Sequence, residues 1–313
     1  MERFNNILLY ANSKSDNKTA LKYASTLAKS NGAKLKIVDV IKEASHYPPI
    51  LPSINNLNLQ DILHDERRRE LDLLSFSHKK NGLDISIKVL SGIPFIEVIR
   101  EIINKEHDLL ITTPGAPEGL SEMLFGTTAM QFMRKCPCPV WAIKPSKRDS
   151  YNNILAAIDF NDEGESDPLL NDKIMELATS MALKEKSGLH IVHAWDMHHE
   201  NMLRHHGHLP DKEIEKVVSR IREYSNSRLE KLVKKYASVI RPKNIHLLKG
   251  KPEEIIPDIA VEENIDLIVM GTLSRTGIPG FFIGNTAEKI LQRVNCSVMS
   301  VKPDGFLSPV TAE

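Results

Sequence analysis

The residues best suited to chemistry lie between Ile265 and Arg293, where a glycine-rich loop joins two apolar segments. The first segment is broken only by Asp266 and ends at Gly271, which is typical of a strand buried on both faces. The second begins at residues 284–286 and has the spacing of an amphipathic helix. Glycines let backbone N–H groups approach an anion, and a helix start supplies unpaired N–H groups and a positive dipole end. This order of elements therefore predicts a phosphate-binding site.

The chain contains two copies of one domain. Asn5-Asn6-Ile7-Leu8 recurs as Asn152-Asn153-Ile154-Leu155, and Gly126-Thr127-Thr128-Ala129 recurs as Gly284-Asn285-Thr286-Ala287. From Gly92 and its equivalent Gly250 onward, the copies keep a constant offset of 158 positions (250 − 92). Such a repeat is far longer than the roughly 20–50 residues of a solenoid unit, so it is a duplicated domain. We expect domains at residues 1–146 and 151–304, followed by a tail at 305–313.

Each copy alternates apolar strand patterns with amphipathic helix patterns. The strands are expected at 7–10, 35–40, 85–90, 109–112 and 140–143, then at 154–158, 189–194, 245–248, 267–270 and 298–301. The helices are expected at 19–30, 59–80, 94–105 and 127–134, then at 170–186, 211–236, 252–263 and 285–292. This alternation predicts an α/β fold of two doubly wound, five-stranded parallel sheets. A ligand in such a sheet binds beyond the strand carboxyl ends, at the switch point between the first and fourth strands.

The loop and the repeat together resemble a tandem member of the universal stress protein family, and its bacterial subgroup E most of all. The family's nucleotide loop reads Gly-x2-Gly-x9-Gly-Ser/Thr, and this chain has Gly271, Ser274, Gly284 and Asn285 at those positions. Ser274 adds a side chain where the backbone approaches phosphate, whereas Asn285 can still cap a helix and donate through its amide. The resemblance implies an adenine-nucleotide alpha-hydrolase-like fold with the two domains packed as a pseudo-dimer.

The resemblance also implies a ligand site in the second copy. Its residues would be Asp159, Gly271, Ser274, Arg275, Gly284, Asn285 and Thr286. In nucleotide-binding members the aspartate equivalent to Asp159 touches the adenosine part of ATP, although an Asp after a strand also caps turns. ATP is thus the implied cofactor, with Mg²⁺ only in its company.

The first copy departs further from the family's loop. Asn12 stands where the aspartate belongs, and Thr113 and Ala116 replace the first two glycines. Pro114 and Pro117 stiffen the loop and remove amide donors. We therefore expect a structural domain here, without a nucleotide site.

Histidines and cysteines raise two further hypotheses. Five histidines cluster in one segment, and they could bind a metal or lie in a solvated loop: His198, His199, His205, His206 and His208. We assign no metal ligand. Cys136-Pro137-Cys138 is not the Cys-x-x-Cys arrangement that lowers a thiol pKa. Cys138 and Cys296 are equivalent positions, expected to be small core residues.

Composition narrows the class of protein. The 41 basic and 41 acidic residues are interspersed, which argues against a general nucleic-acid binder. No apolar run approaches the ~20 residues of a membrane span, and the N-terminus does not read as a signal peptide. Three cysteines suit a reducing cytoplasm better than a disulfide framework. The fifth strand would leave a sheet edge that must be paired or covered.

No catalytic constellation emerges from these motifs. The resemblance implies a cytoplasmic, non-enzymatic ligand-sensing or binding module in resistance to starvation, oxidation or DNA damage. Two alternatives remain: a carrier of an apolar or lipid-like molecule in the domain cleft, and a weak ATP hydrolase or phosphotransfer enzyme of the same fold. Protein partners and a homodimer are left open.

Overall fold

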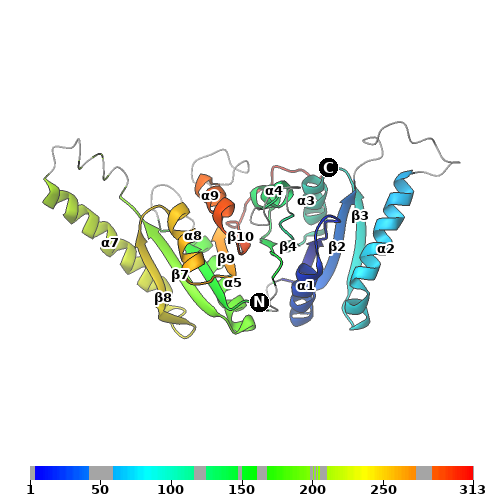
Figure 1. The fold of residues 1–313 in the computed structure, drawn as a ribbon, viewed down its shortest axis with the longest axis horizontal. Coiled ribbons are helices and arrows are strands. Elements are labelled where there is room, and N and C mark those ends of the chain that lie inside the picture. The colour runs from blue at the N-terminus through cyan, green and yellow to red at the C-terminus, as the bar shows by residue number, and fades with distance from the viewer. Residues whose placement is uncertain are drawn as a thin grey trace. The chain divides into compact units, whose positions relative to one another are not determined.

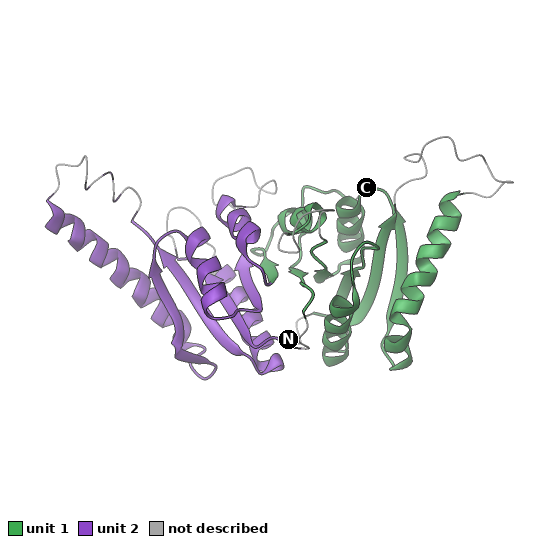
Figure 2. Cartoon of the chain, viewed as in Figure 1, with its two compact units in different colours: residues 1–149, 272–283, 297–313 green, residues 150–271, 284–296 purple. Residues whose placement is uncertain are grey.

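The computed structural model describes residues 4–41, 59–115, 125–146, 150–160, 168–197, 200, 202, 204, 210–272 and 284–312 (Figure 1). The chain forms two compact units (Figure 2). Unit 1 comprises residues 1–149, 272–283 and 297–313, and unit 2 comprises residues 150–271 and 284–296. The last strand of the second repeat therefore belongs to unit 1.

Unit 1 is built on the strand order β3-β2-β1-β4-β5-β10. Its strands are β1 (Asn6–Tyr10), β2 (Lys34–Ile41), β3 (Ile85–Ser91), β4 (Leu109–Thr112), β5 (Val140–Ala142) and β10 (Ser297–Val301), and its helices are α1 (Lys18–Asn31), α2 (Leu59–Lys80), α3 (Pro94–Lys105) and α4 (Thr127–Lys135). The first five strands run parallel, and β10 pairs antiparallel with β5. The edge of β5 is thus paired, as expected for an apolar strand that would otherwise template aggregation.

Unit 2 has the strand order β9-β6-β7-β8, all parallel. Its elements are β6 (Asn153–Ile158), α5 (Pro168–Glu185), β7 (Gly188–Trp195), α7 (Asp211–Lys234), β8 (Ile240–Lys249), α8 (Pro252–Glu262), β9 (Leu267–Gly271) and α9 (Asn285–Arg293). Each repeat contributes five strands within the part of the chain that the structure describes, and the predicted fold class is confirmed. Within the described residues, no helix is both long and apolar enough to span a membrane.

The element limits follow from the residues that bound them. Pro94 and Pro252 each occupy the first helical turn, where a missing N–H costs nothing. The largest departure from the expected limits is β8, which begins at Ile240 instead of residue 245. Its first half, Arg241 to Lys243, is exposed and contains a proline, and such edge-strand sequence lacks the apolar alternation that predicts a strand.

A carboxylate ties the first strand to the fourth strand in both repeats. In unit 1 the Asp108 carboxylate accepts hydrogen bonds from the backbone N–H groups of Asn5 and Asn6, at 2.6 and 3.1 Å. In unit 2 Asp266 Oδ2 accepts those of Asn152 and Asn153, at 2.6 and 3.2 Å. Each contact spans more than 100 residues, so it fixes the register in which the two strands meet.

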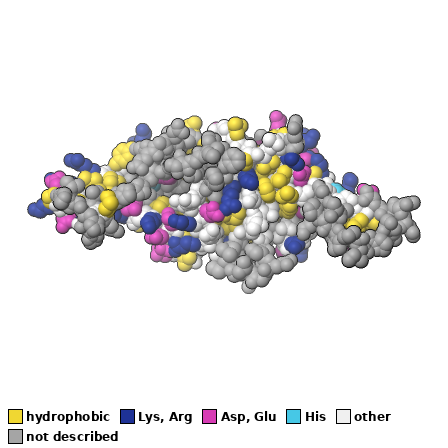
Figure 3. All heavy atoms as spheres, turned by 90° about the horizontal axis from the view of Figure 1, so that it is seen from above, with side chains coloured by type: hydrophobic (Ala, Val, Ile, Leu, Met, Phe, Trp, Pro, Cys, Tyr) yellow, Lys and Arg dark blue, Asp and Glu magenta, His cyan; other side chains and the backbone are white. Residues whose placement is uncertain are grey.

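Charged side chains of both signs are interspersed on the face drawn in Figure 3. The balance of acidic and basic residues in the sequence is therefore also a mixture in space on that face. Among the described side chains of that face, no continuous basic patch of the kind that nucleic-acid binding requires is seen.

The ammonium group of Lys302 is buried in unit 1. Lys302 follows β10, and its Nζ donates to the carbonyl oxygen of Met133 at 2.6 Å and to Oγ1 of Thr272 at 2.7 Å. The ring of Phe306 lies 5.0 Å from the same nitrogen. Burial lowers the pKa of Lys302 to about 7, because an ammonium group loses hydration there.

This burial predicts a stability that depends on pH. Between pH 7 and an ordinary lysine pKa of about 10.4, the unfolded chain holds a proton on Lys302 that the folded chain lacks. The free energy of unfolding should therefore rise with pH across that window. Lys302→Met should remove this contribution, as measured by urea unfolding at a series of pH values. Lys216→Met, at an exposed lysine, is the control and should keep the wild-type slope. An unchanged slope in Lys302→Met would contradict the assignment.

Candidate functional site

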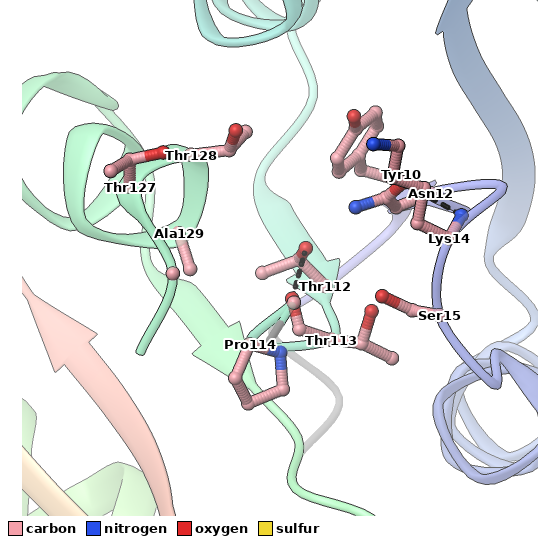
Figure 4. A pocket seen from close by; sticks show the side chains of 12 residues that line it. Tyr10, Asn12, Lys14, Ser15, Thr112, Thr113, Pro114, Thr127, Thr128 and Ala129 are labelled. Carbon is pink, nitrogen blue, oxygen red and sulfur yellow. Dashed lines mark hydrogen bonds between the residues drawn. The ribbon is translucent and has the colours of Figure 1, made fainter. Parts of the chain in front are cut away.

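A cavity of about 140 Å³ lies in unit 1 where β1 and β4 end and α4 begins (Figure 4). Its lining comes from residues 10–15, 112–115 and 126–129. β1 and β4 are neighbouring parallel strands, so the cavity occupies the switch point at which such sheets bind ligands. It is smaller than the roughly 300–1,000 Å³ of a typical small-molecule pocket.

The polar groups that face this cavity come from all three segments. Thr113 is buried, and among the described residues its Oγ1 has no hydrogen-bond partner. Asn12 lies across from Gly115, whose hypothetical Cβ would be 3.5 Å from Asn12 Nδ2. Helix α4 begins after Gly126 without a side-chain cap. The arrangement offers hydroxyl groups, the amide of Asn12 and helix-start N–H groups to a small polar or anionic group.

Gly126 holds the loop after β4 against the start of α4. Its N–H donates to the carbonyl oxygen of Pro114 at 2.9 Å. A Cβ at Gly126 would lie 2.2 Å from the carbonyl oxygen of Gly115 and 2.8 Å from that of Pro114. Only glycine permits this approach, because both obstructing atoms belong to the backbone.

A buried ion pair fixes the end of β1 behind the cavity. Arg67 Nε lies 2.6 Å from Asp39 Oδ2, and Arg67 Nη2 donates to the carbonyl oxygen of Ala11 at 2.7 Å. Burial raises the pKa of the Asp39 carboxyl above its ordinary value, while Arg67 opposes that rise. Burial, with a contribution from Asp39, likewise raises the pKa of the Tyr10 hydroxyl. Tyr10 is therefore a neutral wall of the cavity at physiological pH.

In unit 2 the residue predicted to meet a nucleotide, Asp159, directly follows β6. Its backbone is held on both sides by Asn171, which accepts from Asp159 N–H at 3.1 Å and donates to the Asp159 carbonyl oxygen at 2.7 Å. The Asp159 side chain is exposed. In unit 1, Asn17 donates to the carbonyl oxygen of Asn12 at 2.8 Å, so the two repeats share the donating half of this arrangement. The strand end is thus rigid while the carboxylate faces outward.

The remaining predicted residues lie on the neighbouring strand and the helix that follows it. Gly271 ends β9, which pairs with β6. Gly284 precedes α9 with extended backbone, φ −61° and ψ 141°, close to the φ −63° and ψ 163° of Gly126. Among the described residues no side chain caps α9, and Asn285 and Thr286 are exposed in its first turn.

Two of the predicted site residues, Ser274 and Arg275, lie outside the described residues. So do His198, His199, His205, His206 and His208. The structure brings Asp159 and Gly271 to the same edge of adjacent strands, as the predicted switch point requires. That this edge binds a nucleotide stays a prediction.

Sequence reasoning missed the cavity in the first repeat. In the sequence, Asn12 and Thr113 indicate only departures from the family's loop, yet both line the cavity. Asn12 and Thr113 each follow a strand, and the predicted neighbourhood of these two strands is the signal in the sequence that could have indicated the cavity. The absence of a nucleotide site in this repeat also stays a prediction. The cysteines are buried, as expected of core residues, and Cys136 Sγ lies 3.5 Å from Cys138 Sγ.

Comparison with known proteins gives two matches along the chain. Residues 3–144 and 150–302 each match the model of the universal stress protein family. Universal stress protein E of Photorhabdus laumondii is 28% identical over 316 residues, covering 100% of this chain and 99% of that protein. Universal stress protein E of Escherichia coli K12 is 28% identical over 314 residues, covering 99% and 98%.

A solved structure supports the fold as well. The crystal structure of a putative universal stress protein from Pseudomonas aeruginosa aligns with 97% of this chain and 95% of its own, at a TM-score of 0.72 and 22% sequence identity. At that identity the likeness concerns the fold alone.

The contact at Gly126 generates a prediction about stability. Gly126→Ala should lower the free energy of unfolding by about 1–3 kcal/mol, because two backbone carbonyls must shift. Gly271→Ala is the matched control, since the atoms nearest its Cβ would be side-chain carbons, including Leu170 Cδ2 at 3.0 Å and Ile174 Cδ1 at 3.9 Å, which can move more easily than backbone. Urea unfolding of both variants measures the difference. Equal losses in the two variants would show that the loop moves freely.

Proposed function

Because the chain belongs to the universal stress protein family, we propose that it is a stress-response module that binds an adenine nucleotide in its second repeat. The family membership carries the stress-related role, and the ligand and its place are the proposal. The nucleotide would bind at the carboxyl ends of β6 and β9. Asp159, Gly271, Ser274, Arg275, Gly284, Asn285 and Thr286 are its proposed contacts.

The observation that supports this proposal most is the start of α9. The helix begins after a glycine with extended backbone, and no side chain among the described residues caps it, so its first-turn N–H groups could bind a phosphate. Asp159 follows β6, the strand paired with β9, and presents an exposed carboxylate at the same edge as Gly271. A carboxylate accepts hydrogen bonds from hydroxyl or amino groups, which the nucleoside end of the ligand supplies. Anion donors and a nucleoside acceptor thus share one edge.

The two repeats differ in the groups they offer. At the end of its first strand, unit 1 has the amide of Asn12 in place of the Asp159 carboxylate. Its loop contains Pro114, which lacks an N–H, and its cavity of about 140 Å³ suits a phosphate-sized group better than a whole nucleotide. These differences favour the second repeat.

We propose binding without catalytic turnover. Phosphoryl transfer needs a metal ion and a residue that positions or deprotonates the nucleophile. Among the proposed contacts only Asp159 carries a carboxylate, and it is assigned to the nucleoside. Mg²⁺ would enter only with ATP, bound to its phosphates.

A matched pair of variants tests the location. Asn285→Asp and Thr127→Asp change equivalent exposed positions in the first turns of α9 and α4. Both should fold, because an acidic residue in a first helical turn is favourable. Asn285→Asp should weaken calorimetric binding of ATP with Mg²⁺ by at least about tenfold, since like charges 4 Å apart repel by roughly 1–4 kcal/mol. Thr127→Asp should bind as the wild type does.

The opposite pattern would place the nucleotide in the first repeat, and equal affinity in all three proteins would exclude a phosphate at either helix start. No binding by the wild type would reject the nucleotide itself. Phosphate release that Asp159→Ala abolishes while ATP still binds would favour the hydrolase.

A further inference from the structure

Two histidines and a glutamate converge in unit 2, away from the strand carboxyl ends. His190 Nδ1 lies 3.1 Å from His246 Nε2 and 3.9 Å from Glu263 Oε2. One nitrogen or oxygen from each of the three residues falls within 4.8 Å of the others. His190 is third in β7, so the cluster lies toward the amino ends of the strands, separate from the proposed nucleotide site.

The sheet and one helix end bring these residues together. His246 on β8 is opposite Val192 on β7, and His190, two residues before Val192, points to the same face. The pairing of β7 with β8 has a register irregularity between Leu189 and Ile191, and there Asn244 Nδ2 donates to the carbonyl oxygen of Leu189 at 3.1 Å. Glu263 follows α8 directly, and its carbonyl oxygen accepts from Asn153 Nδ2 at 2.8 Å. Each of the three backbones is therefore anchored.

The first repeat holds a different trio at the same strand positions. Lys36 is third in β2 as His190 is third in β7, and Lys88 is opposite Val38 as His246 is opposite Val192. Both lysines donate to Glu101, at 2.8 and 2.7 Å. That trio is an ion network, because ammonium groups have no lone pair to give. The second repeat has an imidazole in place of each ammonium group, and a neutral imidazole has a nitrogen lone pair that can bind a metal.

The two imidazoles are neutral at physiological pH. Burial lowers the pKa of His190 and of His246, and the charge of Lys243 further lowers that of His190. Glu263 opposes the change at both rings, and Glu262 does so at His246. The rings are within 6° of parallel with centroids 5.5 Å apart. With ring nitrogens 3.1 Å apart, this is the edge-to-edge geometry of an N–H···N hydrogen bond.

We propose that His190, His246 and Glu263 form a zinc site. Two imidazole nitrogens and one carboxylate oxygen are a common Zn²⁺ donor set, with a water in the fourth position. The nitrogen separation of 3.1 Å is close to the roughly 3.3 Å that two ligands at about 2.0 Å have in a tetrahedral site. On binding, both rings turn toward the metal. The imidazole that donates the N–H···N hydrogen bond loses that proton, and a proton on its other ring nitrogen keeps the ring neutral. Glu263, at the negative end of α8, adds a favourable field for a cation.

Zinc titration of the full chain, first stripped with a chelator, tests this site. The wild type should bind Zn²⁺ at the triad, and Co²⁺ in its place should give the visible absorption of a tetrahedral site. Glu263→Gln changes a side chain that is 40% exposed, so the fold should persist. Its affinity should fall by at least about the 10–100-fold that even an outer partner of a metal site costs. The zinc affinity of His246→Gln should be lower still. Glu262→Gln changes the exposed neighbour of Glu263, and its zinc affinity should match that of the wild type.

The histidines near residue 200 are a competing zinc source, so a His205→Gln/His206→Gln double variant is included. Retained Co²⁺ absorption in that variant, with loss in Glu263→Gln and His246→Gln, supports the site. No saturable zinc binding by the wild type would overturn it, as would unchanged affinity in both triad variants. Nucleotide binding by Glu263→Gln should equal that of the wild type, which separates this proposal from the proposed function.

Discussion

The carboxylate that joins the first and fourth strands is the constraint on which each repeat depends. Asp108 and Asp266 each bind two consecutive backbone N–H groups at the start of the first strand. Because the paired strands then run parallel from a fixed origin, their carboxyl ends finish side by side. That edge receives Asn12 and Gly115 in unit 1 and Asp159 and Gly271 in unit 2. The contacts of Asp108 and Asp266 at the amino ends of the strands therefore determine where the candidate site forms at the carboxyl ends.

With the scaffold held in this way, equivalent positions carry different chemistry. The sixth residue of β2 is Asp39, buried and paired with Arg67, whereas the sixth residue of β7 is His193. Burial lowers the pKa of His193, and Arg228 lowers it further, so this imidazole is neutral. Its Nδ1 lies 3.3 Å from the carbonyl oxygen of Ile158, the last residue of β6. The Asp39–Arg67 ion pair thus lies at the end of β1 in the first repeat. In the second repeat, the neutral imidazole of His193 lies at the end of β6.

Most of the fold could be predicted from the sequence because its elements carry strong local patterns. The limits of α2 and α3 agree with the expected ranges, since Pro94 begins α3 and continuous polar-apolar periodicity marks α2. The first half of β8 and the cluster at His190 could not be predicted in this way. Both depend on cross-strand register, and a bulge beside Leu189 shifts that register. Likewise, Asn12 and Thr113 line a cavity only because β1 and β4 are neighbours, although they are 101 positions apart (113 − 12).

The proposed function places a nucleotide at the carboxyl ends of β6 and β9 and none at the equivalent edge of the first repeat. Hydrogen–deuterium exchange with saturating ATP and Mg²⁺ tests it most directly, because it reports on both helix starts in one protein. We expect slower amide exchange in peptides covering residues 284–293 and the end of β6, with no change across residues 126–135. Slower exchange across residues 126–135, with residues 284–293 unchanged, would contradict it.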